Sequence, residues 1–167
     1  KLTELLMDGG KGYRAEITLG AVSTTDDNEG EIASTDAGPV NESAVRLACQ
    51  RFVGRIEQRP PAHSAVHVGG RRAYELARSG ELAELPARAV TVHAIELLSF
   101  NWPVATLSID CGRGVYVRSI ARDLGERLGV GGYLSALTRT RVGPFRADDA
   151  VALEACRENN VSEWLLP

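Results

Sequence analysis

The chain contains little of what a metal site or a membrane-spanning segment needs. Its 167 residues include only three cysteines and three histidines. These six are Cys49, Cys111, Cys156, His63, His67 and His93, and none of them is spaced like a metal ligand set. No apolar run approaches the length that spans a bilayer, and no signal peptide opens the chain. We therefore expect a cytoplasmic protein with buried free thiols and without a metal or a membrane.

Lysine is also scarce, because seventeen of the nineteen basic residues are arginine. The formal net charge of −3 by itself argues against binding to nucleic acid. The charges are unevenly distributed, however. Residues 1–45 carry three basic and nine acidic side chains, whereas residues 46–78 and 112–146 each carry seven arginines and two acidic residues. Codon bias in a GC-rich genome explains the excess of arginine equally well, but the clustering predicts a basic face that suits a polyanion.

The length and the hydrophobic content of 44% indicate one domain over residues 1–167. Strands mixed with helices, without a regular βαβ rhythm, predict an α+β fold with a largely antiparallel mixed sheet flanked by helices. The predicted strands are Tyr13–Leu19, Ser64–Val68, Arg88–Leu98 and Val104–Cys111, with a long loop or weak hairpin over Ser23–Gly38 and an extended segment over Arg139–Phe145. The predicted helices are Lys1–Met7, Ala73–Arg78, Val115–Leu128, Tyr133–Arg139 and Asp148–Asn159. A further helix is predicted to begin after a cap at Asn41 or Ser43, with an apolar face that includes Leu47.

The most informative stretch of the sequence is 111–145. Tyr116 and Arg118 follow a turn that Gly112 and Gly114 make accessible to a ligand, at the start of a helix whose amide groups favour anions. Two further arginines, Arg139 and Arg141, come later in the same stretch. Arginines interleaved with aromatic residues suit a nucleotide, because the charge binds phosphate and the ring stacks on the base. A tyrosine packed at a strand–helix junction and solvent-exposed arginines explain the same pattern without any ligand.

Three motifs make the chain similar to a known family. The stretch from Cys111 resembles C-S-K-G-T-Y-I-R-S-L-A-R-D-L-G followed by Y-L-x-x-L-R-R-T-x-V-G-x-F, which is the signature of the pseudouridine synthases that modify the T-loop uridine of tRNA, the TruB family. Residues 11–20 match K-x-Y-R-x-x-x-x-L-G, and residues 58–78 match Q-x-P-P-x-Y-S-A-x-K-x-x-G-x-R-A-Y-E-x-A-R, with His63 and His67 in place of the tyrosine and the lysine. Asp26, Asp27 and Glu29 lie in a tract that resembles the T-D-T-x-D-x-x-G loop of the bacterial tRNA branch.

The resemblance implies a role for each matched residue. Tyr13 contacts the target base and is a candidate for moving the proton at its C5 atom, Tyr116 stacks on the flipped base, and Arg118 pairs with the catalytic carboxylate. Leu137 forms an apolar wall of the pocket, and the residues that contact RNA around it are His67, Arg71, Arg72, Arg139 and Arg141. The implied protein is an isomerase that uses no cofactor and acts on the T-arm stem-loop of tRNA.

One element of the family signature is missing from these 167 residues. The nucleophilic aspartate of the family lies in a G-x-L-D-P motif, and no aspartate of this chain stands in such a motif. We therefore expect an N-terminally incomplete catalytic domain, without a C-terminal RNA-binding domain, that does not form pseudouridine alone. We also expect Arg118 to lack a carboxylate partner, which leaves a disordered pocket or favours association with another chain. The alternatives are a non-catalytic RNA-binding or tRNA-chaperone protein and a structural module without any RNA role.

Overall fold

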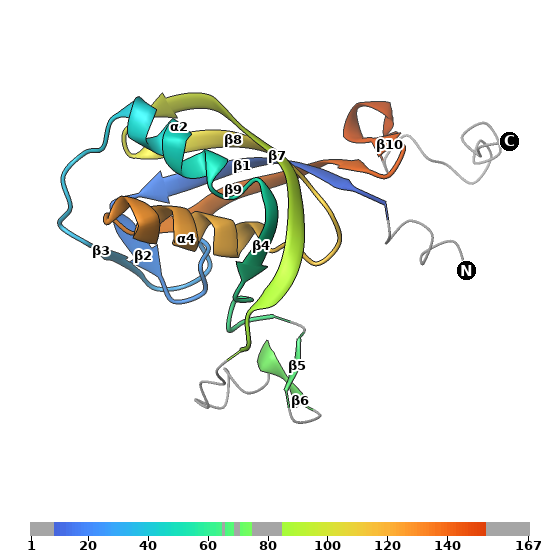
Figure 1. Ribbon diagram of the computed structural model, residues 1–167, viewed down its shortest axis with the longest axis horizontal. Coiled ribbons are helices and arrows are strands. Elements are labelled where there is room, and N and C mark those ends of the chain that lie inside the picture. Colours follow the sequence, from blue (N-terminus) through green and yellow to red (C-terminus); the bar gives the residue numbers. More distant parts are fainter. Residues whose placement is uncertain (1–8, 65, 69–70, 75–84, 153–167) are drawn as a thin grey trace, which may run out of the picture.

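The computed structural model describes residues 9–64, 66–68, 71–74 and 85–152, and it is built around one six-stranded sheet (Figure 1). The strand order is β10-β9-β1-β8-β7-β4, and all neighbouring strands are antiparallel. The strands are β1 (Lys11–Leu19), β4 (Gly54–Gln58), β7 (Arg88–Asn101), β8 (Val104–Cys111), β9 (Gly132–Val142) and β10 (Phe145–Arg146). Two helices, α2 (Glu42–Gln50) and α4 (Val117–Leu128), lie on the same face of this sheet. The α+β prediction is confirmed.

Strand β1 lies at the centre of the sheet and shows the alternation that the sequence predicts. Its inward residues belong to the apolar core together with Ile120 and Leu124 of α4, whereas Arg14 is exposed. These inward residues are Tyr13, Ala15, Ile17 and Leu19. Because side chains alternate between the two faces of a strand, the face that carries Tyr13 is the face that the helices cover.

Helix α2 begins after Asn41, whose side-chain oxygen accepts a hydrogen bond from the backbone N–H of Ala44 at 2.8 Å. An asparagine at this position satisfies an amide group that the helix itself leaves unpaired, so of the two predicted caps the first is correct. The sequence places Leu47 on the apolar face of this helix, but 67% of the residue is exposed, so this prediction is wrong. The buried residues of α2 are Val45, Ala48 and Cys49, which are three and four residues apart, and Leu47 lies off the face that they share.

Helix α4 ends as predicted at Gly129, which adopts a left-handed conformation with φ of 73°. The chain then enters β9, where the sequence predicts a helix over Tyr133–Arg139, and this prediction is wrong. Strand β1 has a backbone edge that pairs with β9 along its whole length, and this non-local pairing overrides the helical spacing of Tyr133 and Leu137. The long strands β7 and β8 pair as predicted, with Trp102-Pro103 between them.

The shorter elements are only partly predicted. Within Ser23–Gly38 the weak hairpin forms from β2 (Ala21–Ser23) and β3 (Ile32–Ser34). A second two-stranded sheet joins β5 (His67–Val68) to β6 (Arg71–Arg72), so the predicted strand over Ser64–Val68 is confirmed only at its end. The extended segment after Arg139 continues as the end of β9 and then β10, with Gly143 in the turn.

No helix begins at Asp148, because Ala147–Asp149 form a single 3-10 turn (η1) and Ala150 returns to an extended conformation. The predicted helix Lys1–Met7, most of Ala73–Arg78 and the part of Asp148–Asn159 beyond residue 152 lie outside the described residues. Cys49 and Cys111 are buried free thiols, as predicted, and Cys156 lies outside the described residues. Burial raises the pKa of both thiols to about 11.

Candidate functional site

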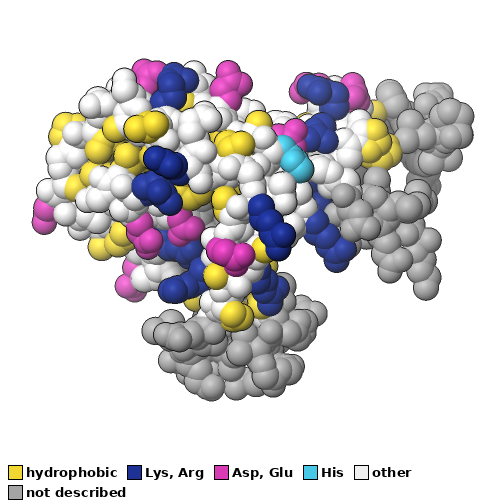
Figure 2. Space-filling view, in the orientation of Figure 1, with side chains coloured by type: hydrophobic (Ala, Val, Ile, Leu, Met, Phe, Trp, Pro, Cys, Tyr) yellow, Lys and Arg dark blue, Asp and Glu magenta, His cyan; other side chains and the backbone are white. Residues whose placement is uncertain are grey.

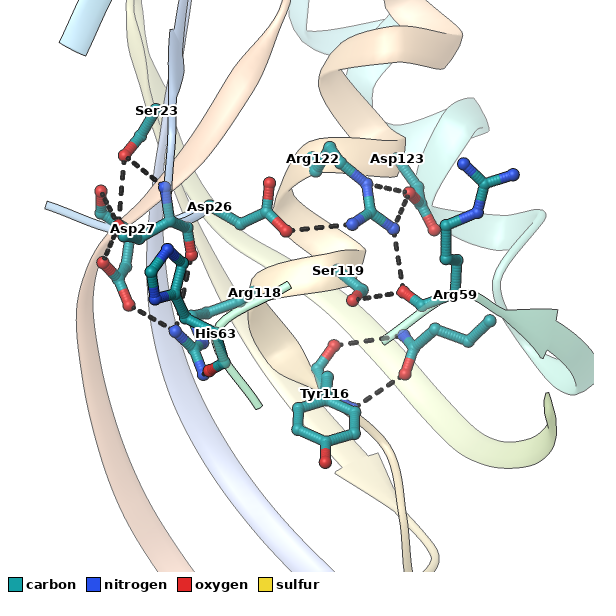
Figure 3. A network of polar contacts seen from close by, with 12 residues as sticks. Ser23, Asp26, Asp27, Arg59, His63, Tyr116, Arg118, Ser119, Arg122 and Asp123 are labelled. Carbon is teal, nitrogen blue, oxygen red and sulfur yellow. Dashed lines mark hydrogen bonds and ion pairs between the residues drawn. The ribbon is translucent and has the colours of Figure 1, made fainter. Parts of the chain in front are cut away.

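The start of α4 is held by side chains from a distant part of the chain. Tyr116 is the N-cap of α4, and its own side chain makes no cap hydrogen bond. The side-chain amide of Gln58 instead accepts a hydrogen bond from the backbone N–H of Tyr116 at 2.8 Å and donates one to its carbonyl at 3.1 Å. Ser119 donates to the carbonyl of Arg59 at 2.8 Å. The segment after β4 is thereby fixed against the first turn of α4 (Figure 3).

Arg118 has a carboxylate partner, which corrects the expectation that it would have none. Its guanidinium donates to Oδ2 of Asp27 at 2.9 Å and to the backbone carbonyl of His63 at 2.9 Å. A longer contact of 3.4 Å reaches the carbonyl of Thr25. The hairpin loop between β2 and β3 brings Asp27 to this position across 91 residues of sequence. Arg118 therefore links this loop, the 59–63 segment and α4 (Figure 3).

Asp27 is held in its ionised form. Burial alone would raise its pKa, but hydrogen bonds from the Thr25 hydroxyl and the Glu29 backbone N–H, together with Arg118, lower the pKa below its ordinary value of 3.8. One turn further along α4, Arg122 makes a second set of bonds, to Asp26 at 2.9 Å, to Asp123 at 2.8 Å and to the Arg59 carbonyl at 3.0 Å. Arg118 and Arg122 thus bind the same loop and the same segment in parallel.

Asp26 differs from its neighbour, because burial raises its pKa above 3.8 in spite of the ion pair with Arg122. Burial also tends to lower the pKa of Arg122, but Asp123 and Asp26 raise it overall, so Arg122 stays charged. The backbone of Asp26 is in the left-handed region with φ of 63°. Its carbonyl accepts a hydrogen bond from Leu134 at 3.0 Å, which joins the loop to β9.

A cavity of about 230 Å³ lies between this loop, Arg118 and β9. Its lining residues are Asp27, Asn28, Glu29, Arg118, Leu134, Ser135, Ala136 and Leu137. Leu137 is 46% exposed, which is unusual for a leucine in the middle of a strand. An apolar wall opposite a charged Arg–Asp pair is an arrangement that can hold a planar polar group. Of the predicted site residues, the structure places Arg118 and Leu137 in one cavity.

Tyr13 is a direct cross-strand partner of Arg139, whose guanidinium lies 5.6 Å from the centre of the Tyr13 ring. Tyr13 and Leu137 share the helix-covered face of the sheet, because Leu137 pairs with Ala15 two residues along β1. Tyr13 is 8% exposed and does not line the cavity of Arg118 and Leu137. Its ring is therefore stacked under Arg139 rather than open to solvent.

Arg141 faces the opposite side of the sheet from Arg139. It makes two bonds of 2.8 Å to the carboxylate of Asp110 and donates to the carbonyl of Gly143 at 3.0 Å. An irregularity in the pairing of β9 with β1, between Gly12 and Tyr13, separates the two arginines. Their spacing in the sequence suggests one cluster, which the structure does not form.

Tyr116 packs against a small apolar cluster of Val66, Ala73 and Leu85, apart from the cavity of Arg118 and Leu137. His67 belongs to β5, and Arg71 and Arg72 belong to β6, so these three of the five residues predicted to contact RNA share one two-stranded sheet. The roles predicted for Tyr13, Tyr116, Arg118, Leu137 and the RNA-contacting residues stay predictions.

Sequence reasoning missed four residues of this network. Asp26 and Asp27 belong to a polar tract, Arg122 stands in the helix of Arg118, and Gln58 begins a motif without being singled out. A usable signal was present, because Arg118 and Arg122 are four residues apart and therefore share a helix face, while Asp26 and Asp27 are adjacent. Two arginines on one face favour a pair of acceptors, and Asp26 and Asp27 are two adjacent carboxylates in one polar tract.

The face that carries α2 and α4 combines both signs of charge. Figure 2 shows arginine and acidic side chains beside one another on it, with apolar side chains gathered over α2, where Leu47 is exposed. In the part of the chain that the structure describes, no cluster of three or more His, Cys, Asp or Glu side chains could hold a metal ion. Within the same ranges, no helix combines the length and the apolar character that crossing a bilayer requires.

Comparison with known sequences finds two family matches that together cover almost all of the chain. Residues 1–117 match the family described as "TruB family pseudouridylate synthase (N terminal domain)", and residues 118–163 match "tRNA pseudouridylate synthase B C-terminal domain". The proteins named tRNA pseudouridine synthase B from Corynebacterium diphtheriae and Pseudomonas aeruginosa are 48% and 43% identical over 158 and 154 residues. The matches cover 89% and 92% of this chain but 52% and 51% of those proteins. The chain thus spans about half the length of the curated relatives it matches.

Comparison with solved structures gives the same fold. A chain of the "Crystal Structure of a Cbf5-Nop10-Gar1 Complex" superposes with a TM-score of 0.67 at 27% identity, over 92% of this chain and 36% of that chain. A chain of an H/ACA RNP bound to a substrate RNA superposes with a TM-score of 0.63 at 24% identity, over 92% of this chain and 35% of that one, which supports the fold alone. With a family match over residues 1–117 and relatives above 40% identity, this chain belongs to the TruB family of pseudouridylate synthases.

Proposed function

We propose that this chain carries the uridine-binding half of a tRNA pseudouridine synthase, which isomerises the T-loop uridine of tRNA in the cytoplasm. The observation that carries the proposal is the identity of 43–48% to proteins named tRNA pseudouridine synthase B over about nine-tenths of the chain. No finding favours the non-catalytic alternative. The T-arm stem-loop as partner follows from the motif resemblance, and the basic stretches 46–78 and 112–146 supply charge for its phosphates.

The reaction places clear demands on a site. The bond between N1 of uracil and C1′ of the ribose breaks, a bond between C5 and C1′ forms, and the proton on C5 is lost while N1 gains one. No electrons are gained or lost overall, so the reaction requires no redox cofactor. The base must leave the RNA stack to be reached, which costs a few kcal/mol. The site must therefore grip an everted uracil and stabilise charge that develops on it.

The cavity of Arg118 and Leu137 fits these demands in part. The apolar wall at Leu137 suits one side of a flat ring, and the fixed charge of Arg118 suits an anionic group beside it. Asp27 forms an ion pair of 2.9 Å with Arg118 and keeps the guanidinium at a defined place. We propose that a nucleophilic carboxylate acts from this side of the cavity, next to Arg118. We also propose that the Arg139 side chain moves off the ring of Tyr13 and that Tyr13 then transfers the proton from C5.

The experiment compares this 167-residue chain with the complete product of the gene that encodes it. Both are incubated with a T-arm stem-loop RNA that carries tritium at C5 of the target uridine, and the release of tritium into water is measured. We expect release with the complete gene product and none with this chain alone. No release with the complete product would overturn the proposed function. Release with the chain alone would show that one of its own carboxylates performs the chemistry, with Asp27→Asn as the first variant to test.

A further inference from the structure

Gln58 is a buried polar residue for which neither the motifs nor the family comparison supplies a role. It ends β4 and is 2% exposed. A buried side-chain amide is costly unless its donor and acceptor are both paired. Both atoms of this amide are paired with one residue, Tyr116, through the N–H at 2.8 Å and the carbonyl at 3.1 Å. The amide of Gln58 thus bonds both the N–H and the carbonyl of Tyr116, as a residue of a neighbouring antiparallel strand would.

The backbone around Tyr116 needs such a restraint. Two residues earlier, Gly114 has φ of 86°, a conformation open to glycine but rare for other residues. Tyr116 itself is extended with φ of −102° and ψ of 113°, and the helix begins directly after it. Its carbonyl also accepts the first hydrogen bond of α4, from the N–H of Ile120 at 3.2 Å. The chain therefore changes direction at a residue whose own side chain contributes no cap.

We propose that Gln58 is a positioning residue that fixes the backbone of Tyr116 and through it the direction of the tyrosine ring, to which the family resemblance assigns stacking on the target base. Gln58 acts on the base through Tyr116, because the hydrogen bonds from its amide nitrogen and to its amide oxygen both involve the backbone of that residue. The bond from Ser119 to the Arg59 carbonyl continues the same attachment one residue further and keeps the end of β4 beside the first turn of α4. This inference rests on the proposed function for the role of the ring, whereas the effect on the backbone of Tyr116 is independent of it.

The effect on the backbone is tested without RNA by amide hydrogen exchange in the chain. Gln58→Met keeps the size of the side chain and removes both hydrogen bonds. Gln58→Glu keeps an acceptor for the Tyr116 N–H but places a carboxylate against its carbonyl. We expect the exchange of the Tyr116 amide to accelerate about tenfold in Gln58→Met, the effect of losing one net hydrogen bond, and to accelerate less in Gln58→Glu. Unchanged exchange in Gln58→Met would overturn the proposal.

A matched control separates this local effect from general loss of stability. The hydroxyl of Thr35 donates to the carbonyl of Val130 at 2.6 Å, just beyond the opposite end of α4. Thr35→Val removes one side-chain-to-backbone hydrogen bond of the same kind. It should leave the exchange of the Tyr116 amide as in the parent chain. If Thr35→Val accelerates that amide as much as Gln58→Met does, the effect is global and the assignment of Gln58 to Tyr116 fails.

The role of the ring is tested with a double-mutant cycle on the affinity for a T-arm stem-loop RNA. A base–aromatic stack that is lost or misplaced should weaken binding by about tenfold, so we expect this loss both for Gln58→Met and for Tyr116→Ala. In the Tyr116→Ala background, Gln58→Met should add less than about twofold, because it acts through the ring that is already absent. Equal losses in both backgrounds would overturn the positioning role. If the parent chain and the complete gene product both fail to bind the RNA, the proposed function fails, and hydrogen exchange still decides what Gln58 does to Tyr116.

Discussion

The two ends of α4 are attached to the rest of the molecule by different kinds of contact. Towards the C-terminal end, Leu124 is fully buried and Gly125 lies directly against the backbone of Gly131 and Gly132. Towards the N-terminal end, Gln58, Arg118 and other polar side chains bond to backbone atoms and carboxylates that come from other segments. Buried apolar residues such as Ile120 and Leu124 therefore pack along the whole of α4. The C-terminal half, called the packed half below, is held by this packing, and the N-terminal half, called the polar half, has the polar contacts in addition.

The two kinds of contact have different effects, because apolar packing mainly stabilises the fold and hydrogen bonds mainly fix where side chains and backbone lie. Apolar burial is strong and tolerates small rotations, because its free energy follows the area removed from water. Hydrogen bonds contribute less to stability but depend on distance and angle, so they define where each group lies. We infer that the packed half keeps α4 on the sheet, whereas the polar half places Arg118 and Tyr116 relative to the cavity and the loop.

The largest effect is expected in the packed half, for Gly125→Ala. A Cβ atom at this position would lie 2.1 Å from the carbonyl carbon of Gly131 and from the nitrogen of Gly132. Backbone atoms at the turn into β9 cannot move away cheaply, so we expect a loss of about 3 kcal/mol or more in the free energy of unfolding, measured by urea denaturation. Gly38→Ala is the control, because nothing lies within 4 Å of its added Cβ. A Gly125→Ala loss as small as that of Gly38→Ala would contradict the close packing.

A smaller effect, which varies with pH and has opposite directions for Asp27 and Asp26, is expected in the polar half. The lowered pKa of Asp27 stabilises the fold above pH 3.8, and this stabilisation is lost as the pH falls through the pKa of the folded state. The raised pKa of Asp26 acts in the opposite direction, since its contribution is lost as the pH rises through that pKa. Compared with the parent, Asp27→Asn should become less stable as the pH rises from about 3 to 7, and Asp26→Asn more stable. Urea denaturation across this range measures both, and equal slopes for the two variants would refute the assignment.

The smallest effect is expected for an ion pair outside both halves. Glu42 and Arg46 of α2 lie 2.6 Å apart, closer than Asp27 and Arg118, but both side chains are more than half exposed. Water screens such a pair, so Glu42→Gln should cost less than about 0.5 kcal/mol, and this cost should vanish in high salt. If Glu42→Gln lowers the free energy of unfolding as much as Asp27→Asn does at pH 7, distance rather than burial determines the contribution of these ion pairs. The contrast between the polar half of α4 and an exposed ion pair would then be wrong.

The sequence predicts best those elements whose signals are local. The alternation in β1 and the stop signal at Gly129 both act within a few residues, and both are found where expected. Strand β9 was missed because its partner β1 is more than a hundred residues earlier, and because two irregularities interrupt its alternation. Tyr133 and Leu137 are four residues apart, which is also the spacing of neighbours on one face of a helix, and this spacing favoured the wrong element.

The candidate site shows the same limit. The motifs identify Arg118 and Leu137, which do line one cavity. They identify neither Asp27 as the partner of Arg118 nor Gln58 as the partner of Tyr116, because each pair joins segments that only the folded sheet brings together. Arg139 and Arg141 show the converse error, since two residues close in sequence are assigned to one surface although the pairing of β9 with β1 places them on opposite faces.

The irregularity beside Thr140 has a consequence for how this strand can change. Arg139 and Arg141 lie on opposite faces because Thr140 is an extra residue between their partners Tyr13 and Gly12, and not because of their own chemistry. If β9 kept Thr140 but paired without this irregularity, Arg141 and Val142 would turn to the other faces of the sheet. The ion pair of Asp110 with Arg141 thus depends on the register of β9 against β1 as well as on the two residues themselves.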